Sequence, residues 1–297
     1  MAARVATLRV PAEVAVRRSA NTAWSRFRRD RVAIGSLVVL ALIALLALLA
    51  PIIAPDYTSV DLDNIKQPPS WQHPLGTDSA GRDVWARVVH GARVSMSVGV
   101  VAVGIATAIG TLIGLVSGYV GSQIDNLLMR FTELVQTFPL FFAVVILVAL
   151  VGPNLLNVML VIGLISWPGL ARLVRGQVLS LRAQQFVEAA RALGAPDWRI
   201  ILRHILPGVL PYLAVYGTLA LASAILTEAA LSFLGLGVQM PVPSWGGMMN
   251  SAQSLTVLEG QPWLWVPPGV AIATTVLCAN FVGDGLRDAF DPRMGVR

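Results

Sequence analysis

Long stretches of this chain contain no charged residue, and shorter charged segments separate them. A helix needs about 20 mostly apolar residues to cross the hydrocarbon core of a membrane. The uncharged stretches that reach this length are residues 32–55, 94–124, 134–171, 205–227 and 260–283. Residues 134–171 are too long for one span, and Gly152-Pro153-Asn154 divides them into two. The pattern therefore predicts an all-α membrane protein with six transmembrane helices.

Residues 229–258 are also uncharged, but their pattern does not predict a further span. Residues that interrupt helices recur along this stretch: Gly235, Gly237, Pro241, Pro243, Gly246 and Gly247. Proline lacks the amide hydrogen that a helix interior needs, and glycine costs about 1 kcal/mol there relative to alanine. We therefore expect an ordered loop at the membrane surface.

The composition and the charge distribution agree with a membrane protein. Hydrophobic residues make up 56% of the chain and charged residues 13%, whereas a soluble domain has about 25% charged residues. The formal net charge is +6, and 18 of the 22 basic residues lie in segments 1–31, 119–132, 172–204 and 284–297. Basic residues concentrate on the cytosolic side of membrane proteins. The distribution predicts that both termini are cytosolic, and it explains the positive charge without a nucleic-acid partner.

A few residue types limit the chemistry that this chain can perform. Lys66 is the only lysine and does not follow the glycine-rich turn of a P-loop, which excludes a Walker-type nucleotide site. Cys278 is the only cysteine, which excludes an intrachain disulfide and a cysteine metal cluster. The three histidines, His73, His90 and His204, are far apart in the sequence. We expect no cofactor and no metal in this chain.

Ionisable residues are nearly absent from the predicted spans. Glu133, Glu228 and Asp284 lie near span ends. A proton-coupled transporter or a voltage sensor would carry carboxylates or arginines within the membrane. Their absence indicates that another chain supplies the energy for transport, and it disfavours a self-sufficient secondary transporter. A membrane enzyme is disfavoured as well, because no polar residues cluster at one depth.

Two smaller patterns leave alternatives open. Gly110, Gly114 and Gly118 recur every four residues on one helix face, a spacing that lets two helices approach closely. That face could pack against another helix of this chain or against a partner subunit. His73 and Asp78, with the nearby Asp83, lie on a predicted outer loop. Their nitrogen and oxygen atoms could bind a metal ion, but aspartate commonly stabilises turns, and a turn-forming role is the expectation.

The segment 184–207, between the fourth and fifth predicted spans, has the clearest local signals. Residues up to Leu193 are good helix formers. Gly194 can take the left-handed conformation that ends a helix, and Pro196 with Asp197 suits the first turn of a new helix. We therefore expect two short helices that meet at Gly194. The second has an apolar face and a basic face, which suits either the membrane surface or a groove in another protein.

The same segment resembles the EAA motif of ABC importer permeases. The residues that carry the resemblance are Glu188-Ala189-Ala190, Gly194 and Ile205-Leu206-Pro207. His204 stands where the general motif has an apolar residue, and the resulting Arg-His-Ile-Leu-Pro is typical of the peptide-importer subgroup. Stretches 73–84, 227–237, 243–246 and 283–293 also resemble dipeptide and oligopeptide permeases. From residue 32 to residue 293, the chain is therefore similar to the C-type permease subunit of these importers.

The resemblance implies the fold of a type I ABC importer permease, with six transmembrane helices and a cytosolic EAA coupling loop at 174–207. The partners that it implies are a second homologous permease in a heterodimer, two ABC ATPase subunits, an extracytoplasmic substrate-binding protein, a peptide substrate and the lipid bilayer. ATP and Mg²⁺ would bind to the ATPase subunits, so this chain would be a non-catalytic subunit. Its location would be the bacterial plasma (inner) membrane, as a multi-pass protein.

The implied organisation has five parts. They are a basic cytosolic tail (1–31), a first transmembrane helix (32–55), an extracytoplasmic loop (56–93), a five-helix permease core (94–293) and a C-terminal tail (294–297). The residues implied to couple to an ATPase are Glu188, Ala189, Ala190, Gly194, Pro196, Asp197, Trp198, Arg199, Leu202, Arg203 and Pro207. Glu228 and Trp245 are candidates for an outer gate or a contact with the binding protein. For Glu228, the alternative is a hydrogen-bonding anchor at the membrane interface.

The substrate has alternatives within the same family. Import of a nickel complex or of glutathione is the alternative to import of dipeptides or oligopeptides, because permease sequences of these branches are alike. The binding protein selects the substrate in such systems, so the permease sequence does not identify it.

Overall fold

The computed structural model describes residues 24–291, and their regular structure is helical. The helices are α2 (Arg31–Ile53), α3 (Val84–Val120), α4 (Ser122–Thr137), α5 (Leu140–Val151), α6 (Leu155–Ile165), α7 (Pro168–Arg182), α8 (Gln185–Ala192), α9 (Asp197–Ile200), a π turn (Ile201–Ile205), α10 (Leu206–Phe233), α11 (Trp245–Met249), α12 (Leu255–Gly260) and α13 (Val266–Phe290). Three 3₁₀ turns lie at Leu62–Asn64, Asn250–Gln253 and Pro262–Leu264. Apart from residues 24–31, the predicted terminal tails fall outside the described residues.

Within residues 24–291, five helical stretches are long and apolar enough to cross a membrane. They are Arg31–Ile53, Val84–Val120, Leu155–Arg182, Asp197–Phe233 and Val266–Phe290. The pair α4 and α5 makes a sixth if it is counted as one span, although the two helices are bent by 82° relative to each other. The predicted all-α fold is therefore confirmed, and the predicted six spans are reached when the bent pair counts as one. The expected loop over 229–258 is not a further span, but it begins five residues later than predicted, because α10 continues to Phe233. The short helices α11 and α12 follow within it, and α12 ends at Gly260.

The third span differs from its prediction because the chain breaks near Pro139. The sequence predicted one continuous helix from Leu134, but α4 ends at Thr137 and α5 begins at Leu140. Phe138 is extended, with φ −83° and ψ 129°. A residue before proline is pushed out of the helical region, and proline has no amide hydrogen to continue the helix. The length of the apolar run alone did not show this break.

Helix α3 begins ten residues earlier than the predicted span. The Asp83 carboxylate accepts a hydrogen bond of 2.9 Å from the Ala86 backbone amide and so caps the first turn. The helix has 37 residues and is therefore about 55 Å long, whereas the hydrocarbon core is about 30 Å thick. Residues 84–93 of the predicted extracytoplasmic loop are thus helical. Arg87 and Arg93 mark where the uncharged run ends, not where the helix ends.

The glycine stripe of α3 packs against α7 of the same chain. A Cβ atom on Gly110 would lie 3.0 Å from the Leu170 Cβ, and one on Gly114 would lie 2.6 Å from the Val174 Cβ. A Cβ on Gly118 would lie 2.7 Å from the Val178 Cβ. These distances are too short for carbon atoms, so the close approach of the two helices requires glycine. The structure thus supports the intrachain interpretation of the stripe.

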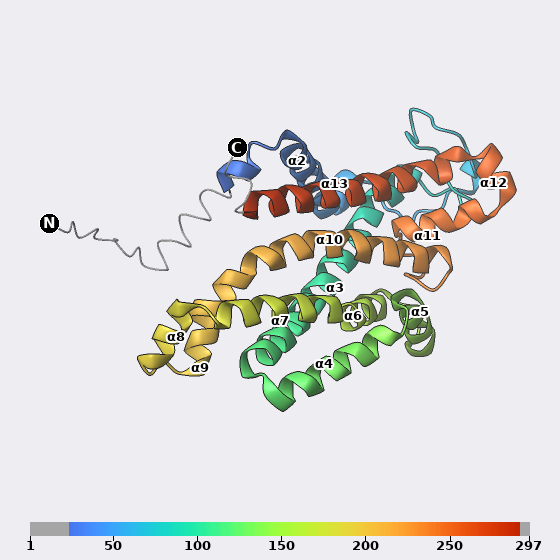
Figure 1. The fold of residues 1–297 in the computed structure, drawn as a ribbon. Coiled ribbons are helices and arrows are strands. Elements are labelled where there is room, and N and C mark those ends of the chain that lie inside the picture. The colour runs from blue at the N-terminus through green and yellow to red at the C-terminus, as the bar shows by residue number, and fades with distance from the viewer. Residues whose placement is uncertain (1–23, 292–297) are drawn as a thin grey trace.

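The two described ends of the chain lie together. The Arg26 guanidinium donates a hydrogen bond of 3.0 Å to the Asp291 carbonyl, and Phe27, Ala33 and Val282 form one apolar cluster. Figure 1 places these ends and α8–α9 at one end of the bundle, here called the α8–α9 end, with α11 and α12 at the opposite end. Residues 24 and 291, the two ends of the described chain, thus lie at the same end of the bundle as the predicted coupling loop.

Candidate functional site around Gly194

The predicted turn between two short helices is present at Gly194. Gly194 has φ +77°, which is the left-handed region that favours glycine. Its amide donates a hydrogen bond of 2.9 Å to the Arg191 carbonyl, and the Ala195 amide donates one of 3.1 Å to the Ala190 carbonyl. These bonds end α8 and turn the chain toward α9. Pro196 occupies the N-cap position rather than the predicted first helical position, because α9 begins at Asp197.

Large apolar side chains project from this turn into open space. Leu193 is 88% exposed, Trp198 is 66% exposed and Leu202 is 54% exposed. Their neighbours Val187 and Ile200 are fully buried and fix the two short helices to the body of the protein. A group of exposed large apolar side chains marks an interaction surface. Leu193, Trp198 and Leu202 are called the apolar ridge below.

The other predicted coupling residues surround the apolar ridge. Most of them are exposed: Glu188, Ala189, Gly194, Pro196, Asp197, Arg199 and Arg203. Ala190 is half-buried, and so is Pro207, which lies in the first turn of α10. The structure therefore brings the motif residues together at one end of the bundle. Trp198 and Leu202 lie beside Arg199 and Arg203, so a partner groove would meet apolar and basic groups at once.

A π turn joins α9 to the membrane-spanning helix α10. Residues Ile201–Ile205 form this turn, and Ile205 is fully buried against Val178 and Val209 in an apolar cluster. Single π turns inside longer helices frequently occur at functional sites. Because α9, the π turn and α10 form one helical stretch from Asp197 to Phe233, displacement of α9 would act directly on α10.

Tyr119, near the last residue of α3, contacts the same loop, and sequence patterns gave no sign of this. Its hydroxyl donates a hydrogen bond of 2.5 Å to the Asp197 carboxylate. The Arg191 guanidinium lies 5.7 Å from the centre of the Tyr119 ring and 3.5 Å from its hydroxyl, and this hydrogen bond raises the pKa of Arg191. Arg182 donates a hydrogen bond of 2.8 Å to the Tyr119 carbonyl. One residue of α3 therefore contacts the end of α7, α8 and the start of α9.

An ion pair fixes the start of α4 to α7 next to this contact. The Arg175 guanidinium donates two hydrogen bonds of 2.6 Å to the two carboxylate oxygens of Asp125. Ser117 of α3 also donates to this carboxylate. A bidentate arginine–carboxylate pair has a fixed geometry. The α8–α9 end is therefore held together by directed polar contacts as well as by apolar packing.

The second predicted site, Glu228 and Trp245, is buried inside the chain. The Glu228 carboxylate is fully buried and accepts hydrogen bonds of 3.0 Å from Ser95 and 2.7 Å from Ser232. The Trp245 side chain is 2% exposed and donates a hydrogen bond of 2.9 Å to the Val88 carbonyl. Neither side chain has the exposed surface that a contact with a binding protein requires. The Glu228 carboxylate instead joins α10 to α3 inside the chain through Ser95, while an outer-gate role and an anchor at the membrane interface both stay predictions.

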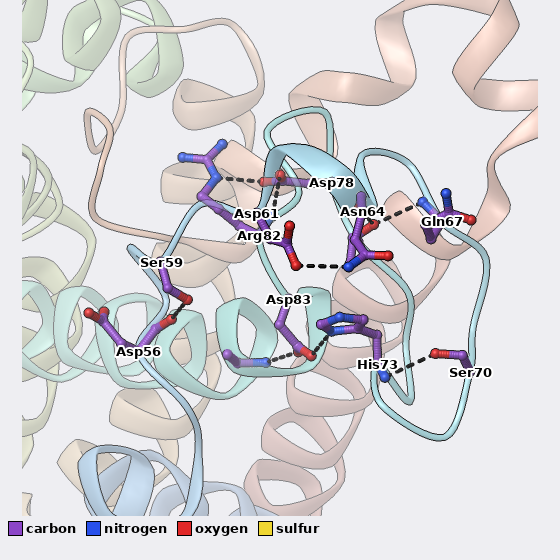
Figure 2. Close-up of polar contacts among 12 residues, drawn as sticks. Asp56, Ser59, Asp61, Asn64, Gln67, Ser70, His73, Asp78, Arg82 and Asp83 are labelled. Atoms are coloured by element: carbon purple, nitrogen blue, oxygen red, sulfur yellow. Dashed lines mark hydrogen bonds and ion pairs between the residues drawn. The ribbon is translucent and has the colours of Figure 1, made fainter.

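The loop before α3 is held by turns and caps, which Figure 2 shows. Asp78 accepts hydrogen bonds from the Ala80 amide at 2.8 Å and the Arg82 amide at 3.0 Å, and Arg82 also pairs with it through its side chain. The His73 Nδ1 atom lies 2.8 Å from the Asp83 carboxylate, whose other oxygen caps α3. These contacts fit the expected turn-forming role. Within residues 24–291, no three His, Cys, Asp or Glu side chains are grouped to hold a metal ion.

A surface groove lies between α5, α10 and α13. Its volume is about 360 Å³, and its lining carries no charged side chain. The lining residues are Phe141, Leu219, Ala222, Ser223, Leu226, Thr227, Ala230 and Asn280. The groove therefore offers hydroxyl and amide groups on an otherwise apolar wall.

Comparison with known families defines the class of protein. Residues 110–296 match the family described as binding-protein-dependent transport system inner membrane component. Residues 20–69 match the N-terminal TM domain of oligopeptide transport permease C. The chain therefore belongs to the family of inner membrane components of binding-protein-dependent transport systems. With its apolar helices, it is a multi-pass inner membrane protein.

Curated relatives narrow the class to C-type permeases. The chain is 45% identical to a putative peptide permease protein of Brucella suis, over 93% of this chain and 90% of the relative. It is 44% identical to the oligopeptide transport system permease protein OppC of Haemophilus influenzae, over 90% of this chain and 86% of the relative. It is 43% identical to the glutathione transport system permease protein GsiD of Escherichia coli, over 91% and 89%. The sequence-based resemblance to the C-type permease subunit is thus confirmed.

A solved structure shows the same fold. The inward-facing MetNI methionine ABC transporter matches with a TM-score of 0.57 and 18% identity, over 68% of this chain and 96% of the matched chain. The predicted fold of a type I ABC importer permease is confirmed by this likeness.

Proposed function

We propose that this chain is one of two permease subunits of an ATP-driven importer for dipeptides or oligopeptides. Its partners are a homologous permease in a heterodimer, two ATPase subunits that bind ATP and Mg²⁺, and an extracytoplasmic binding protein that delivers the substrate. The observation that carries the proposal is the family match over residues 110–296 together with the OppC relatives. The sequence contains no P-loop, which supports ATP hydrolysis by the partners rather than by this chain.

The loop around Gly194 is the proposed contact with an ATPase. The apolar ridge would fill a groove of the ATPase, and Arg199 and Arg203 would meet acidic groups at its rim. Exposed aromatic and apolar anchors ringed by charge are typical of interfaces that carry most of their energy in a few residues. The α8–α9 end would then face the cytosol, in line with the positive-inside distribution of arginines.

The surface groove between α5, α10 and α13 is the proposed half of the substrate passage. Ser223, Thr227 and Asn280 can hydrogen-bond to the backbone amides that every peptide carries, and no charge in the lining selects for one side chain. The second permease would close this open groove. Support comes from the position of the groove on α10, the helix that continues the proposed ATPase contact.

The test of the proposed function is substrate-stimulated ATP hydrolysis by the reconstituted four-part complex. The complex is placed in lipid vesicles with the binding protein, and hydrolysis and peptide uptake are measured together. We expect both to rise when the binding protein carries a dipeptide or an oligopeptide. Uptake that persists without ATPase subunits would contradict the proposal and favour a self-sufficient transporter.

Glutathione import is the second candidate, because the glutathione permease GsiD is 43% identical over 91% of this chain. Calorimetric titration of the binding protein with tripeptides, glutathione and a nickel chelate separates the candidates. We expect the peptides to bind at least tenfold more tightly than the other two ligands. If only glutathione bound tightly, glutathione rather than peptides would be the proposed substrate, and the proposed permease role would be unchanged.

A further inference from the structure

Tyr119 has an unusual position for a residue of the central helix. It lies at the end of α3 and is 6% exposed, yet its polar groups contact three segments of the loop. Asp197 accepts a hydrogen bond from its hydroxyl, Arg191 lies over its ring, and Arg182 donates a hydrogen bond to its carbonyl. Tyrosine is the one aromatic residue that supplies an apolar body for burial and a hydroxyl for such a contact.

These contacts give α9 two attachments to the membrane-spanning helices. The first is covalent, because the π turn continues α9 into α10. The second is the hydrogen bond from Tyr119 to Asp197, which attaches α9 to α3. Figure 1 shows α3 running through the middle of the bundle, where it packs against α2, α6, α7 and α10. A displacement of α9 that reached α3 would therefore reach most of the bundle.

We propose that Tyr119 is a positioning residue that makes α3 a second path for the movement of the ATPase-contacting loop. Through Asp197, Tyr119 moves with α9, so that α3 and α10 shift together. Through Arg182 and Arg191, the same residue keeps α7 and α8 in register with that shift. This proposal rests on the proposed function, because it assigns a path for movement within an ATP-driven importer.

The physical reason is the stiffness of the contact. A hydrogen bond to a carboxylate is about twice as strong as one between neutral groups, and the buried Tyr119 ring cannot move without the packing around it. Replacement by phenylalanine keeps the ring, its packing and the contact of Arg191 with the ring face. It removes only the hydroxyl, so Asp197 loses its tether to α3 and Arg191 loses its 3.5 Å hydrogen bond to that hydroxyl, while α9 stays attached to α10.

The test is Tyr119→Phe in the reconstituted complex with its partner permease, ATPases and binding protein. Uptake and ATP hydrolysis are measured in the same vesicles, and their ratio is the readout. We expect the complex to co-purify in normal yield, and we expect substrate transported per ATP to fall at least about fivefold, which fits the loss of one hydrogen bond to a charged group. An unchanged ratio would overturn the proposal.

Tyr57→Phe is the matched control. Tyr57 packs its ring against His90 of α3 at 4.7 Å, so it is the same residue type near the opposite end of the same helix. Removal of its hydroxyl should leave the ratio of uptake to hydrolysis unchanged. An equal fall of the ratio in both variants would also overturn the proposal, because it would show general sensitivity of α3 rather than a specific path.

A double-mutant cycle distinguishes a path from local packing. Asp197→Ala should reduce the ratio as much as Tyr119→Phe, and the double variant should be no worse than either single one. Asp197→Asn, which keeps an acceptor for Tyr119, should restore most of the ratio that Asp197→Ala loses. Additive losses in the double variant would contradict the proposed path.

The failure of this proposal can be distinguished from the failure of the proposed function. If the wild-type complex shows no substrate-stimulated ATP hydrolysis, the proposed function fails. If the wild-type complex shows stimulated hydrolysis and Tyr119→Phe keeps the wild-type ratio, only the role of Tyr119 fails.

Discussion

The Glu228 carboxylate of α10 accepts a hydrogen bond of 3.0 Å from the Ser95 hydroxyl of α3, 133 positions earlier in the chain. Ser95 is fully buried, and its oxygen lies 3.3 Å from the Trp245 backbone amide, which donates to it. Ser232 donates to the other carboxylate oxygen. The carboxylate thus joins two membrane-spanning helices and the start of α11 in one polar cluster.

Glu228→Ala should destabilise the protein, because it leaves the Ser95 and Ser232 hydroxyls buried without their acceptor. An unsatisfied buried polar group costs about 1–3 kcal/mol. We expect a lower melting temperature of the detergent-purified complex, measured by loss of its monodisperse fraction on heating. Glu228→Gln keeps the acceptor oxygen and should lose much less. Equal melting temperatures for Glu228→Ala and the wild type would show that the cluster is not an anchor.

Gly194→Val should uncouple ATP hydrolysis from uptake. A β-branched residue at φ +77° is strained, and a left-handed residue other than glycine costs about 1–2 kcal/mol. The turn between α8 and α9 would open and displace the apolar ridge. The control is Gly176→Val on α7, where an added Cβ meets nothing within 4 Å and φ is helical. Normal coupling in the Gly194 variant would make the proposed role of this turn wrong.

Arg199→Glu should weaken the association of the chain with its ATPase. Arg199 is exposed on α9 beside the apolar ridge, and reversal of a rim charge changes association mainly through electrostatics. We expect less ATPase to co-purify with the variant, with a smaller dependence on salt than for the wild type. Arg93→Glu is the control, because it reverses an exposed charge near the start of α3, far from the α8–α9 end. It should leave co-purification unchanged. The same salt profile for both variants would contradict a role of Arg199 at the interface.

Gly114→Ala should disturb the packing of α3 on α7. The added carbon would lie 2.6 Å from the Val174 Cβ, which is shorter than a normal contact between carbon atoms. Overpacking of a core costs about 1–3 kcal/mol. We expect a lower melting temperature of the purified complex. Gly104→Ala is the control, because its added carbon meets no atom of this chain within 4 Å. Loss of stability in the Gly104 variant alone would contradict close packing at Gly114. It would indicate instead that α3 packs against a partner subunit at Gly104.

The sequence predicted the features of this protein that depend on local chemistry. The lengths of uncharged runs located the spans, and Gly194 between two helix-forming segments predicted the turn that the structure shows. Run length does not predict the break near Pro139, because it does not include the restriction that proline places on Phe138. It does not predict the early start of α3 either, because arginines mark the edge of the membrane rather than the end of a helix.

Contacts between distant segments could not be predicted from one sequence. Tyr119 and Asp197 are 78 positions apart, and neither the spacing nor the residue types indicate that they meet. The burial of Glu228 depends in the same way on Ser95, which lies in another helix. Both contacts arise from the packing of α3 against its neighbours, and helix periodicity describes only which face of each helix is available.

The central claim is that the loop around Gly194 contacts an ATPase, and site-specific cross-linking measures this directly. Cys278, the only cysteine, is first replaced by serine. A single new cysteine is then introduced by Trp198→Cys or by Trp71→Cys, the latter at a fully exposed position. This cysteine carries a photoactivatable group in the assembled complex. We expect position 198 to cross-link to the ATPase and position 71 not to do so. Cross-linking of the ATPase to position 71, or its absence at position 198, would contradict a contact between this loop and the ATPase.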